Sequence, residues 1–352
     1  MVDDTLTASA DELAGRIGGA VLAAIRTELH ISQEALAERL QVGLGTVQAW
    51  ESGRRPLVKA SFQDLQRISR RLRLEGAPSE LLHVLDQALL VDSIYIDMRS
   101  ADQDRHPLAL IVPDRTLTEL LAWPLTGDPP RQLRTTKARL HIAPGVRDAV
   151  AASLREVADR SAPDERGAMM RRQVKFLVAD NPASAEWVRA QVLADVRSHP
   201  DIRTWSPQWA VARSQAVSMA HAGDLDPLRR FITQGLADET AADANLNYWA
   251  YWVGEHATPW TQDADMTRRA AAGWSGDRLL DSLVDGVAHA PYRELCIHTL
   301  WALLRRRSHL MRRGRGAERV TETADLVLSR AELTNDARRR LEQVRYLAES
   351  AG

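Results

Sequence analysis

The chain has 352 residues, of which 45% are hydrophobic and 26% charged, as is ordinary for a water-soluble globular protein of two or three domains. Its 46 basic and 47 acidic residues leave a net charge of −1, so any affinity for nucleic acid must come from a local patch. A single cysteine excludes a disulfide framework and fits a reducing cytoplasm, and no apolar run is long enough to predict a membrane span.

The first residues are acidic and contain no apolar run, which argues against a signal peptide. We expect residues 1–19 to form a flexible leader. The Ala, Arg and Leu bias of the chain points to a bacterial genome of high GC content.

Residues 32–56, SQEALAERLQVGLGTVQAWESGRRP, contain two short helical patterns joined by a tight polar turn. Ser32 lies at the N-cap position of the first pattern. Its apolar face has helical spacing and consists of Leu36, Ala37 and Leu40. Ala37 is small, which allows a second helix to cross closely.

The second pattern predicts a helix over residues 44–52. Val47 and Trp50 lie three positions apart and are expected to point inward. The outward face then comprises Gly45, Thr46, Gln48 and Ala49. Gly53 is expected to end this helix.

A basic run follows this helix. Between Arg54 and Arg73 there are seven basic residues and one acidic residue, Asp64. Such a local excess of positive charge is the electrostatic footprint of a protein that binds a polyanion.

Residues 21–74 resemble the helix-turn-helix domain of the Cro and lambda-repressor class, the xenobiotic-response-element family. The matching residues are Arg26, Ser32, Gln33, Leu36, Ala37, Val47, Trp50, Glu51, Gly53, Arg54, Arg55 and Pro56. The resemblance implies that Arg26 and Glu51 form an internal salt bridge. It also implies that the second helix lies in the major groove of DNA. One position departs from the family: Gln41 stands where the turn usually has glycine, so it must adopt a left-handed backbone or shift the turn.

The resemblance assigns base-facing positions to Leu44, Gly45, Thr46, Gln48 and Ala49. We expect Gln33, Arg54, Arg55 and Lys59 to contact the DNA backbone. Gln48 pairs best with adenine, whereas Leu44 and Thr46 offer apolar contact to thymine methyl groups. Because few of these side chains form hydrogen bonds, DNA shape is expected to carry part of the specificity.

The DNA-binding domain is expected to span residues 20–75. Ser61 is a good N-cap for its last helix, and the inner face of that helix is predicted to contain Phe62, Leu65, Ile68 and Leu72. Residues 76–140 then form a linker helix and a Pro-rich connecting segment. In this helix Leu82, Leu85 and Leu89 repeat at helical spacing, and they pair either with a second protomer or with the neighbouring domain. The run LALIV at 108–112 is either a short strand or a buried helical turn.

Residues 141–352 read as helix after helix, with short loops rich in Pro, Gly, Ser or Asp. We therefore expect an all-α protein: a five-helix lambda-repressor-like domain followed by a larger helical bundle or irregular α-solenoid for sensing and dimerisation. No clean repeat with a period near 34 residues is present, so the likeness to tetratricopeptide-type sensor domains is architectural only.

The densest group of aromatic residues lies in the helical region and suggests a ligand or peptide site. Its members are Tyr248, Trp249, Tyr251 and Trp252, with Glu255 and His256 as candidate polar anchors. In the alternative interpretation, the aromatic side chains only fill gaps between helices.

No metal-binding or catalytic motif is found, and the ten histidines show no metal-ligand spacing, so no cofactor, metal or enzymatic activity is expected. Cys296 lies in an apolar pattern and is expected to be a buried small hydrophobe. A second basic run, from Arg305 to Arg319, is a helix end, a further DNA contact or a site for an anionic ligand.

Together these features predict a dimeric, nucleoid-associated cytoplasmic transcription regulator that binds an operator in double-stranded DNA, with no membrane association. A small-molecule or peptide effector is expected to act on the helical region. The alternative is a DNA-tethered adaptor whose helical array binds a protein partner.

Overall fold

The computed structural model describes residues 13–98, 106–110, 112–136, 140, 142–197, 202–255, 260–261, 273–312 and 316–350. The protein is all-α, as the sequence predicts, and divides into two compact units, Met1–Gln191 and Val192–Gly352.

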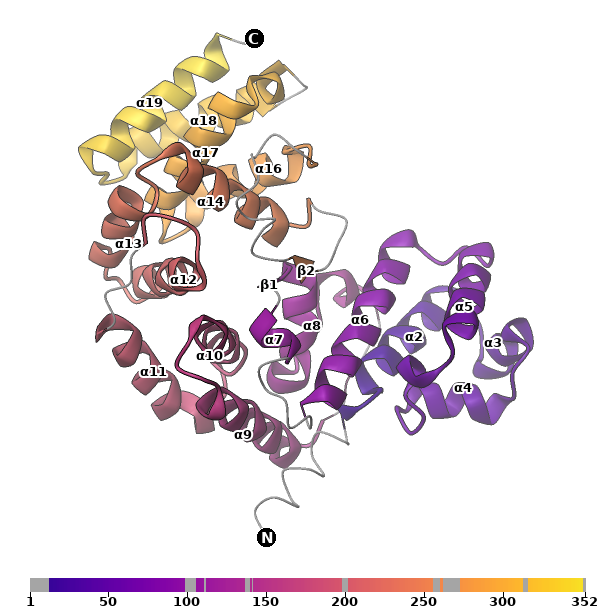
Figure 1. Ribbon diagram of the computed structural model, residues 1–352. Coiled ribbons are helices and arrows are strands. Elements are labelled where there is room, and N and C mark those ends of the chain that lie inside the picture. Colours follow the sequence, from indigo (N-terminus) through magenta and orange to yellow (C-terminus); the bar gives the residue numbers. More distant parts are fainter. Residues whose placement is uncertain are drawn as a thin grey trace. The chain divides into compact units, whose positions relative to one another are not determined.

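The first unit begins with a group of short helices around a common core (Figure 1). They are α2 (Arg16–Glu28), α3 (Gln33–Leu40), α4 (Leu44–Glu51), the 3-10 helix η1 (Leu57–Lys59) and α5 (Phe62–Leu74). α2 includes the last residues of the expected leader, and Ile17 is fully buried. α3 and α4 are the two helices of the predicted helix-turn-helix.

α5 begins as predicted, since the Ser61 hydroxyl accepts a hydrogen bond from the backbone N–H of Asp64 at 3.1 Å. Ile68 and Leu72 are buried on its inner face. The prediction for Phe62 is wrong, because this side chain is 75% exposed. Helical side chains lean toward the N-terminus, so a side chain on the first residue of α5 projects past the edge of the core.

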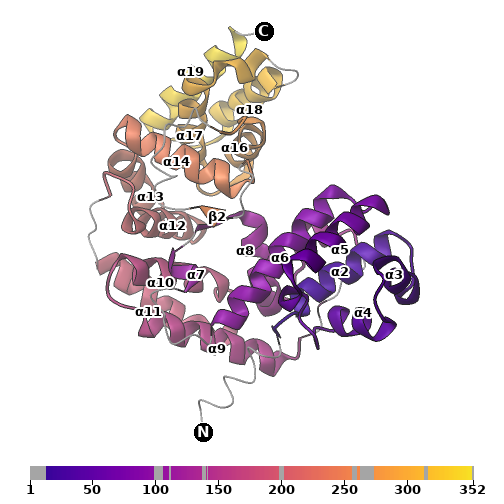
Figure 2. The ribbon, with the colours of Figure 1, turned by 45° about the vertical axis from the view of Figure 1, so that its right-hand side comes forward.

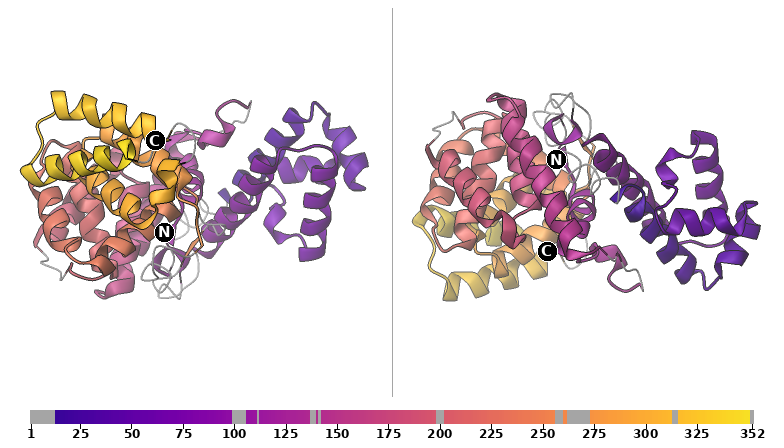
Figure 3. Two further views of the ribbon diagram at one scale, coloured as in Figure 1. Left: turned by 90° about the horizontal axis from the view of Figure 1, so that it is seen from above. Right: turned by 90° about the horizontal axis from the view of Figure 1, so that it is seen from below.

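α6 (Ser79–Asp97) joins the helix-turn-helix to the rest of the first unit, because it packs on both α2 and α8 (Arg115–Thr126). Leu82 and Leu85 are each 3% exposed and lie in the core. Both leucines are therefore already covered by other parts of the same chain, as expected if they pack on the neighbouring domain. Figure 3 shows α2–α5, in indigo and violet, apart from the magenta helices of the same unit.

The remainder of the first unit consists of further helices and one two-residue strand. The elements are α7 (Pro107–Leu110), the strand β1 (Val112–Pro113), the 3-10 helix η3 (Arg131–Leu133), α9 (Pro144–Arg160), α10 (Glu165–Leu177), η4 (Pro182–Ser184) and the first half of α11 (Ala185–Arg197), within which the division between the units falls. The LALIV run thus begins in a helical turn and ends in the strand, so it contains both alternatives.

The second unit continues the helical series (Figure 2). Its elements are α12 (Pro207–His221), α13 (Asp226–Arg230), the π-helix η5 (Phe231–Gly235), α14 (Glu239–Trp252), the two-residue strand β2 (Trp260–Thr261), α16 (Asp277–His289), α17 (Arg293–Arg306), the 3-10 helix η6 (Ser308–Arg312), α18 (Gly316–Arg330) and α19 (Asn335–Glu349). α16 packs on α17, and α18 packs on α19. α17 is also covered by α14 and α19, which makes it the central helix of this unit.

Candidate nucleic-acid interface

The sequence left open whether Gln41, in the turn between α3 and α4, adopts a left-handed backbone or the turn shifts. Gln41 adopts the left-handed backbone conformation, with φ 56° and ψ 44°, so the turn keeps its length. Two hydrogen bonds close α3: the N–H of Gln41 donates to Glu38 O at 3.1 Å, and that of Val42 donates to Ala37 O at 3.0 Å. A side chain in this conformation costs roughly 1–2 kcal/mol, and these contacts offset it.

α4 divides into a buried and an outward face. Val47 and Trp50 are 0% and 5% exposed, as predicted. On the other side Gly45 and Gln48 are exposed, while the remaining three positions of the expected base-facing set are half-buried: Leu44, Thr46 and Ala49. A helix held from behind in this way presents one face to a ligand without moving.

The inner side of α4 lies against the backbone of α2 at Gly19. A Cβ atom at Gly19 would overlap the carbonyl oxygen of Trp50 and lie 2.8 Å from that of Glu51. Only glycine therefore permits this crossing. The role of Gly19 is not evident from the sequence, because a glycine within a helical pattern does not show which helix crosses it.

Glu51, the last residue of α4, ties three helices together. Its carboxylate pairs with the Arg26 guanidinium of α2, at 2.6 Å for Nε–Oε1 and 3.1 Å for Nη2–Oε2. The Gln33 amide at the start of α3 donates to Glu51 Oε2 at 2.7 Å. The internal salt bridge implied by the resemblance is present, and it fixes the angle between α3 and α4.

The chain leaves α4 through Gly53, whose φ of 77° lies in the left-handed region. The N–H of Gly53 donates to Trp50 O, and that of Arg55 donates to Ala49 O, both at 3.0 Å. Arg54, Arg55 and Lys59 follow on the surface. Among the residues that the structure describes, no carboxylate pairs with any of these three cations.

The basic residues of α5 are partly neutralised. Arg67 pairs with Asp64 at 2.8 Å, and Arg71 pairs with Glu75 at 3.1 Å. The charge of the run that has no carboxylate partner among the described residues therefore lies in the segment 54–59 and at Arg70 and Arg73 of α5.

A buried carboxylate of α6 caps the first helix of this domain. Asp92 is fully buried and accepts hydrogen bonds from the backbone N–H groups of Ile17 at 3.2 Å and Gly18 at 2.9 Å. Burial raises the pKa of the Asp92 carboxyl to about 7, against the lowering effect of these hydrogen bonds. α2 has no side-chain cap of its own, so Asp92 satisfies N–H groups that would otherwise lack an acceptor.

The aromatic group of α14 lies mostly in the interior. Tyr248, Trp249 and Tyr251 are at most 6% exposed, and Trp252 is half-buried. The guanidinium of Arg213 lies over two of these rings, 4.5 Å from the centroid of Tyr248 and 4.9 Å from that of Trp249. These contacts are those of aromatic side chains that fill space between helices.

The two candidate polar anchors, Glu255 and His256, have different outcomes. Glu255 accepts hydrogen bonds from the Leu279 N–H and the Ser275 hydroxyl, both at 3.1 Å, and so stabilises the start of α16. His256 lies outside the described residues. Cys296 is fully buried, and burial raises the pKa of its thiol, as expected of an inert side chain.

The second basic run does not act as a unit. Arg306 pairs with Asp243 at 3.0 Å, and Arg319 pairs with Asp281. Arg307 lies over the Trp274 ring, 4.0 Å from its centroid. Arg305 keeps an exposed guanidinium at the edge of a pocket.

In a comparison with protein families, residues 22–77 match the family model described as Helix-turn-helix. Neither the curated proteins nor the solved structures give a match. In the described part of the chain, no cluster of metal-ligating side chains is found. No helix in these same ranges has the length and apolar character needed to cross a membrane.

Proposed function

Because residues 22–77 form a helix-turn-helix domain of the lambda-repressor-like class, a DNA-binding fold of transcription regulators, we propose that this protein regulates transcription by binding a specific operator. One observation carries the proposal. α4 is fixed from behind by Val47, Trp50 and the Glu51 network, and its outward face lies beside cations that have no acidic partner in the described part of the chain.

The outward face of α4 supplies the base contacts. Gln48 is exposed and has both a donor and an acceptor, so it suits adenine. Thr46 adds a hydroxyl and a methyl group, and Leu44 and Ala49 offer apolar contact to thymine. Gly45 lets the helix approach the base edges closely. This small set of polar groups favours a site read partly through DNA shape.

The flanking groups hold the DNA backbone. Arg54, Arg55 and Lys59 provide positive charge at one end of α4. Gln33 contributes from the N-terminus of α3, where free backbone N–H groups favour a phosphate. Its amide donates one hydrogen to Glu51 and keeps a second for the DNA.

The protein acts as a homodimer on two half-sites about one helical turn, or 34–36 Å, apart. This follows from the short stretch of bases that one such domain reads. The operator is then a dyad-symmetric element, and the protein resides with the nucleoid in the cytoplasm.

The helical region beyond residue 140 mediates dimerisation and senses an effector. α6 provides a physical route between that region and the DNA, since it caps α2 through Asp92 and also contacts α8, which in turn packs on α9. An effector that biased the position of α6 would change the spacing of the two DNA-binding domains.

The experiment is to incubate the purified protein with fragmented genomic DNA and sequence the retained fragments. Enrichment of one dyad-symmetric motif supports the proposal. Retention of all fragments in proportion to their length contradicts it, and favours the alternative of a DNA-tethered adaptor. A pull-down from the source cells then tests the adaptor directly, by capture of a protein partner on the helical region alone.

A further inference from the structure

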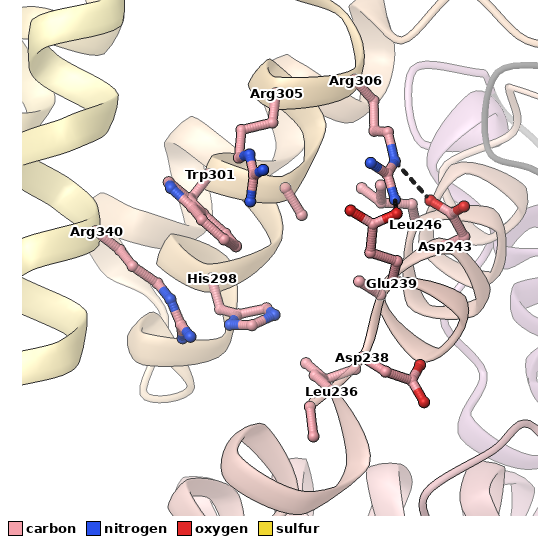
Figure 4. A pocket seen from close by; sticks show the side chains of 13 residues that line it. Leu236, Asp238, Glu239, Asp243, Leu246, His298, Trp301, Arg305, Arg306 and Arg340 are labelled. Atoms are coloured by element: carbon pink, nitrogen blue, oxygen red, sulfur yellow. Dashed lines mark hydrogen bonds and ion pairs between the residues drawn. The ribbon is translucent and has the colours of Figure 1, made fainter.

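A pocket of about 150 Å³ lies between α14, α17 and α19 in the second unit (Figure 4). A cavity of roughly this volume accommodates a molecule the size of a benzene ring. One wall is a single face of α17, on which His298, Trp301 and Arg305 lie at helical spacing.

His298 is the unusual member of this wall. It is 3% exposed, and within the described ranges neither of its ring nitrogens has a hydrogen-bond partner. Burial, with a smaller effect of the nearby Arg340, lowers the pKa of His298 to about 3, so the ring is neutral at physiological pH. A neutral imidazole has one donor and one acceptor, and leaving both unused in the interior is unfavourable. A bound molecule with an acceptor atom would satisfy the N–H.

Arg305 supplies the charge. Its guanidinium lies over the Trp301 ring at 4.8 Å from the centroid, and it has no carboxylate partner among the described residues. Arg340 approaches the same ring at 5.1 Å but pairs with Asp336 at 2.7 Å. The cation–π contact with Trp301 thus orients the Arg305 guanidinium, and the charge of Arg305 stays available for a ligand.

The opposite wall, at the start of α14, is acidic, but its carboxylates are already engaged. Asp243 and Glu239 pair with Arg306 at 3.0 Å and 3.5 Å. Asp238 accepts the Ala241 N–H at 2.7 Å and caps the helix. The remaining lining on this side includes the apolar side chains of Leu236 and Leu246.

We propose that this pocket binds a small organic carboxylate with a compact apolar body. The carboxylate pairs with Arg305 and accepts the N–H of His298, and the apolar body rests against Leu236 and Leu246. The pocket is then the effector site of the proposed function, and the proposal rests on that function only for the effect of the ligand on DNA binding. Binding of the carboxylate is therefore measured without DNA, so that ligand binding and the proposed regulation can fail separately.

The test uses benzoate as the probe and benzamide, its uncharged isostere, as the matched comparison. Calorimetric titration of the full-length protein should show saturable benzoate binding, with benzamide at least about tenfold weaker, the factor that corresponds to roughly 1.4 kcal/mol. In nitrogen-15 NMR of labelled histidine, benzoate should shift the His298 signals and leave those of the exposed His309 unchanged.

Two variants locate the site. Arg305→Gln removes an exposed charge, so it should keep the fold and weaken benzoate binding about tenfold. His298→Phe should weaken it as well, with circular dichroism as the check on folding. Arg330→Gln changes an exposed arginine elsewhere and should have no effect. Three results would overturn the proposal: no benzoate binding, equal affinity for benzoate and benzamide, or an affinity that Arg305→Gln leaves unchanged.

Discussion

The carboxylate of Asp92 accepts the backbone N–H of Gly18 at 2.9 Å, although the two residues lie 74 positions apart in the chain. This hydrogen bond and its neighbour at Ile17 make α6 part of the DNA-binding domain, because a residue of α6 completes the N-terminus of α2. The Asp92 carboxyl is also an ionisable group in the interior, so the stability of the junction between α2 and α6 depends on pH.

We predict that stability at this junction falls as the pH rises. The folded-state pKa of Asp92, about 7, lies above the ordinary 3.8, so the folded protein holds this proton more tightly than the unfolded chain. The resulting stabilisation is complete below pH 3.8 and is lost as the pH rises through 7, by at most about 1.4 kcal/mol per pH unit. Asp92→Asn, which resembles the protonated acid, should flatten this slope in urea unfolding between pH 5 and about 8.

Asp97→Asn is the matched control for that measurement, because Asp97 is an exposed acid on the same helix. It should leave the slope unchanged. Equal slopes for the wild-type protein and Asp92→Asn would show that Asp92 does not titrate in this range.

Glu51→Ala should destabilise the domain by roughly 2–4 kcal/mol, because it leaves the Arg26 guanidinium and the Gln33 amide without their partner in a mostly buried setting. Urea unfolding of the full-length protein, followed by circular dichroism, measures this loss. Glu34→Ala, an exposed acid of α3, is the control. A loss below about 0.5 kcal/mol for Glu51→Ala would mean that the network contributes little.

The two glycines Gly19 and Gly45 should respond oppositely to alanine. At Gly19 a methyl group would overlap the Trp50 carbonyl oxygen, so Gly19→Ala should destabilise the domain by about 1–3 kcal/mol. At Gly45 no atom lies within 4 Å of the added carbon, so Gly45→Ala should stabilise the helix by about 0.5–1 kcal/mol. Thermal unfolding of both variants compares the signs directly. Stabilisation by Gly19→Ala would contradict the close crossing of α2 and α4.

The cations that follow α4 should set the salt dependence of DNA binding. Each phosphate contact contributes about −0.9 to the slope of log K against log salt concentration. Replacing Arg54, Arg55 and Lys59 together by glutamine should therefore reduce the slope on a random-sequence duplex by about 2–3. Arg330→Gln serves as the control, and an unchanged slope in the triple variant would move the phosphate contacts elsewhere.

The sequence predicts the helix-turn-helix well because its signals are local. Ser32 and Ser61 are N-caps, Gly53 ends α4 in the left-handed conformation, and Val47 and Trp50 are buried at helical spacing. Each of these depends on residues a few positions apart. The all-α class follows in the same way from periodicity repeated along the chain.

The features that the sequence did not predict depend on tertiary contacts. Asp92 lies in an apolar pattern and is an acceptor only because the N-terminus of α2 packs against it. His298 belongs to an apolar helix, and the lack of a partner for its ring nitrogens among the described residues is evident only once α14 and α19 surround it. Phe62 fits the helical period of α5 yet lies outside the core, because periodicity does not show where a core ends. The DNA and ligand assignments stay predictions.

The most direct test of operator binding by α4 uses the motif enriched from the genomic fragments. Its binding to the double variant Thr46→Ala, Gln48→Ala is measured by fluorescence anisotropy. Gln234→Ala, an exposed residue of the second unit, is the control. We predict that the double variant loses roughly 10- to 100-fold in operator affinity and keeps its affinity for random duplex, while the control matches the wild-type protein. Unchanged discrimination between operator and random duplex in the double variant would contradict the placement of α4 in the major groove.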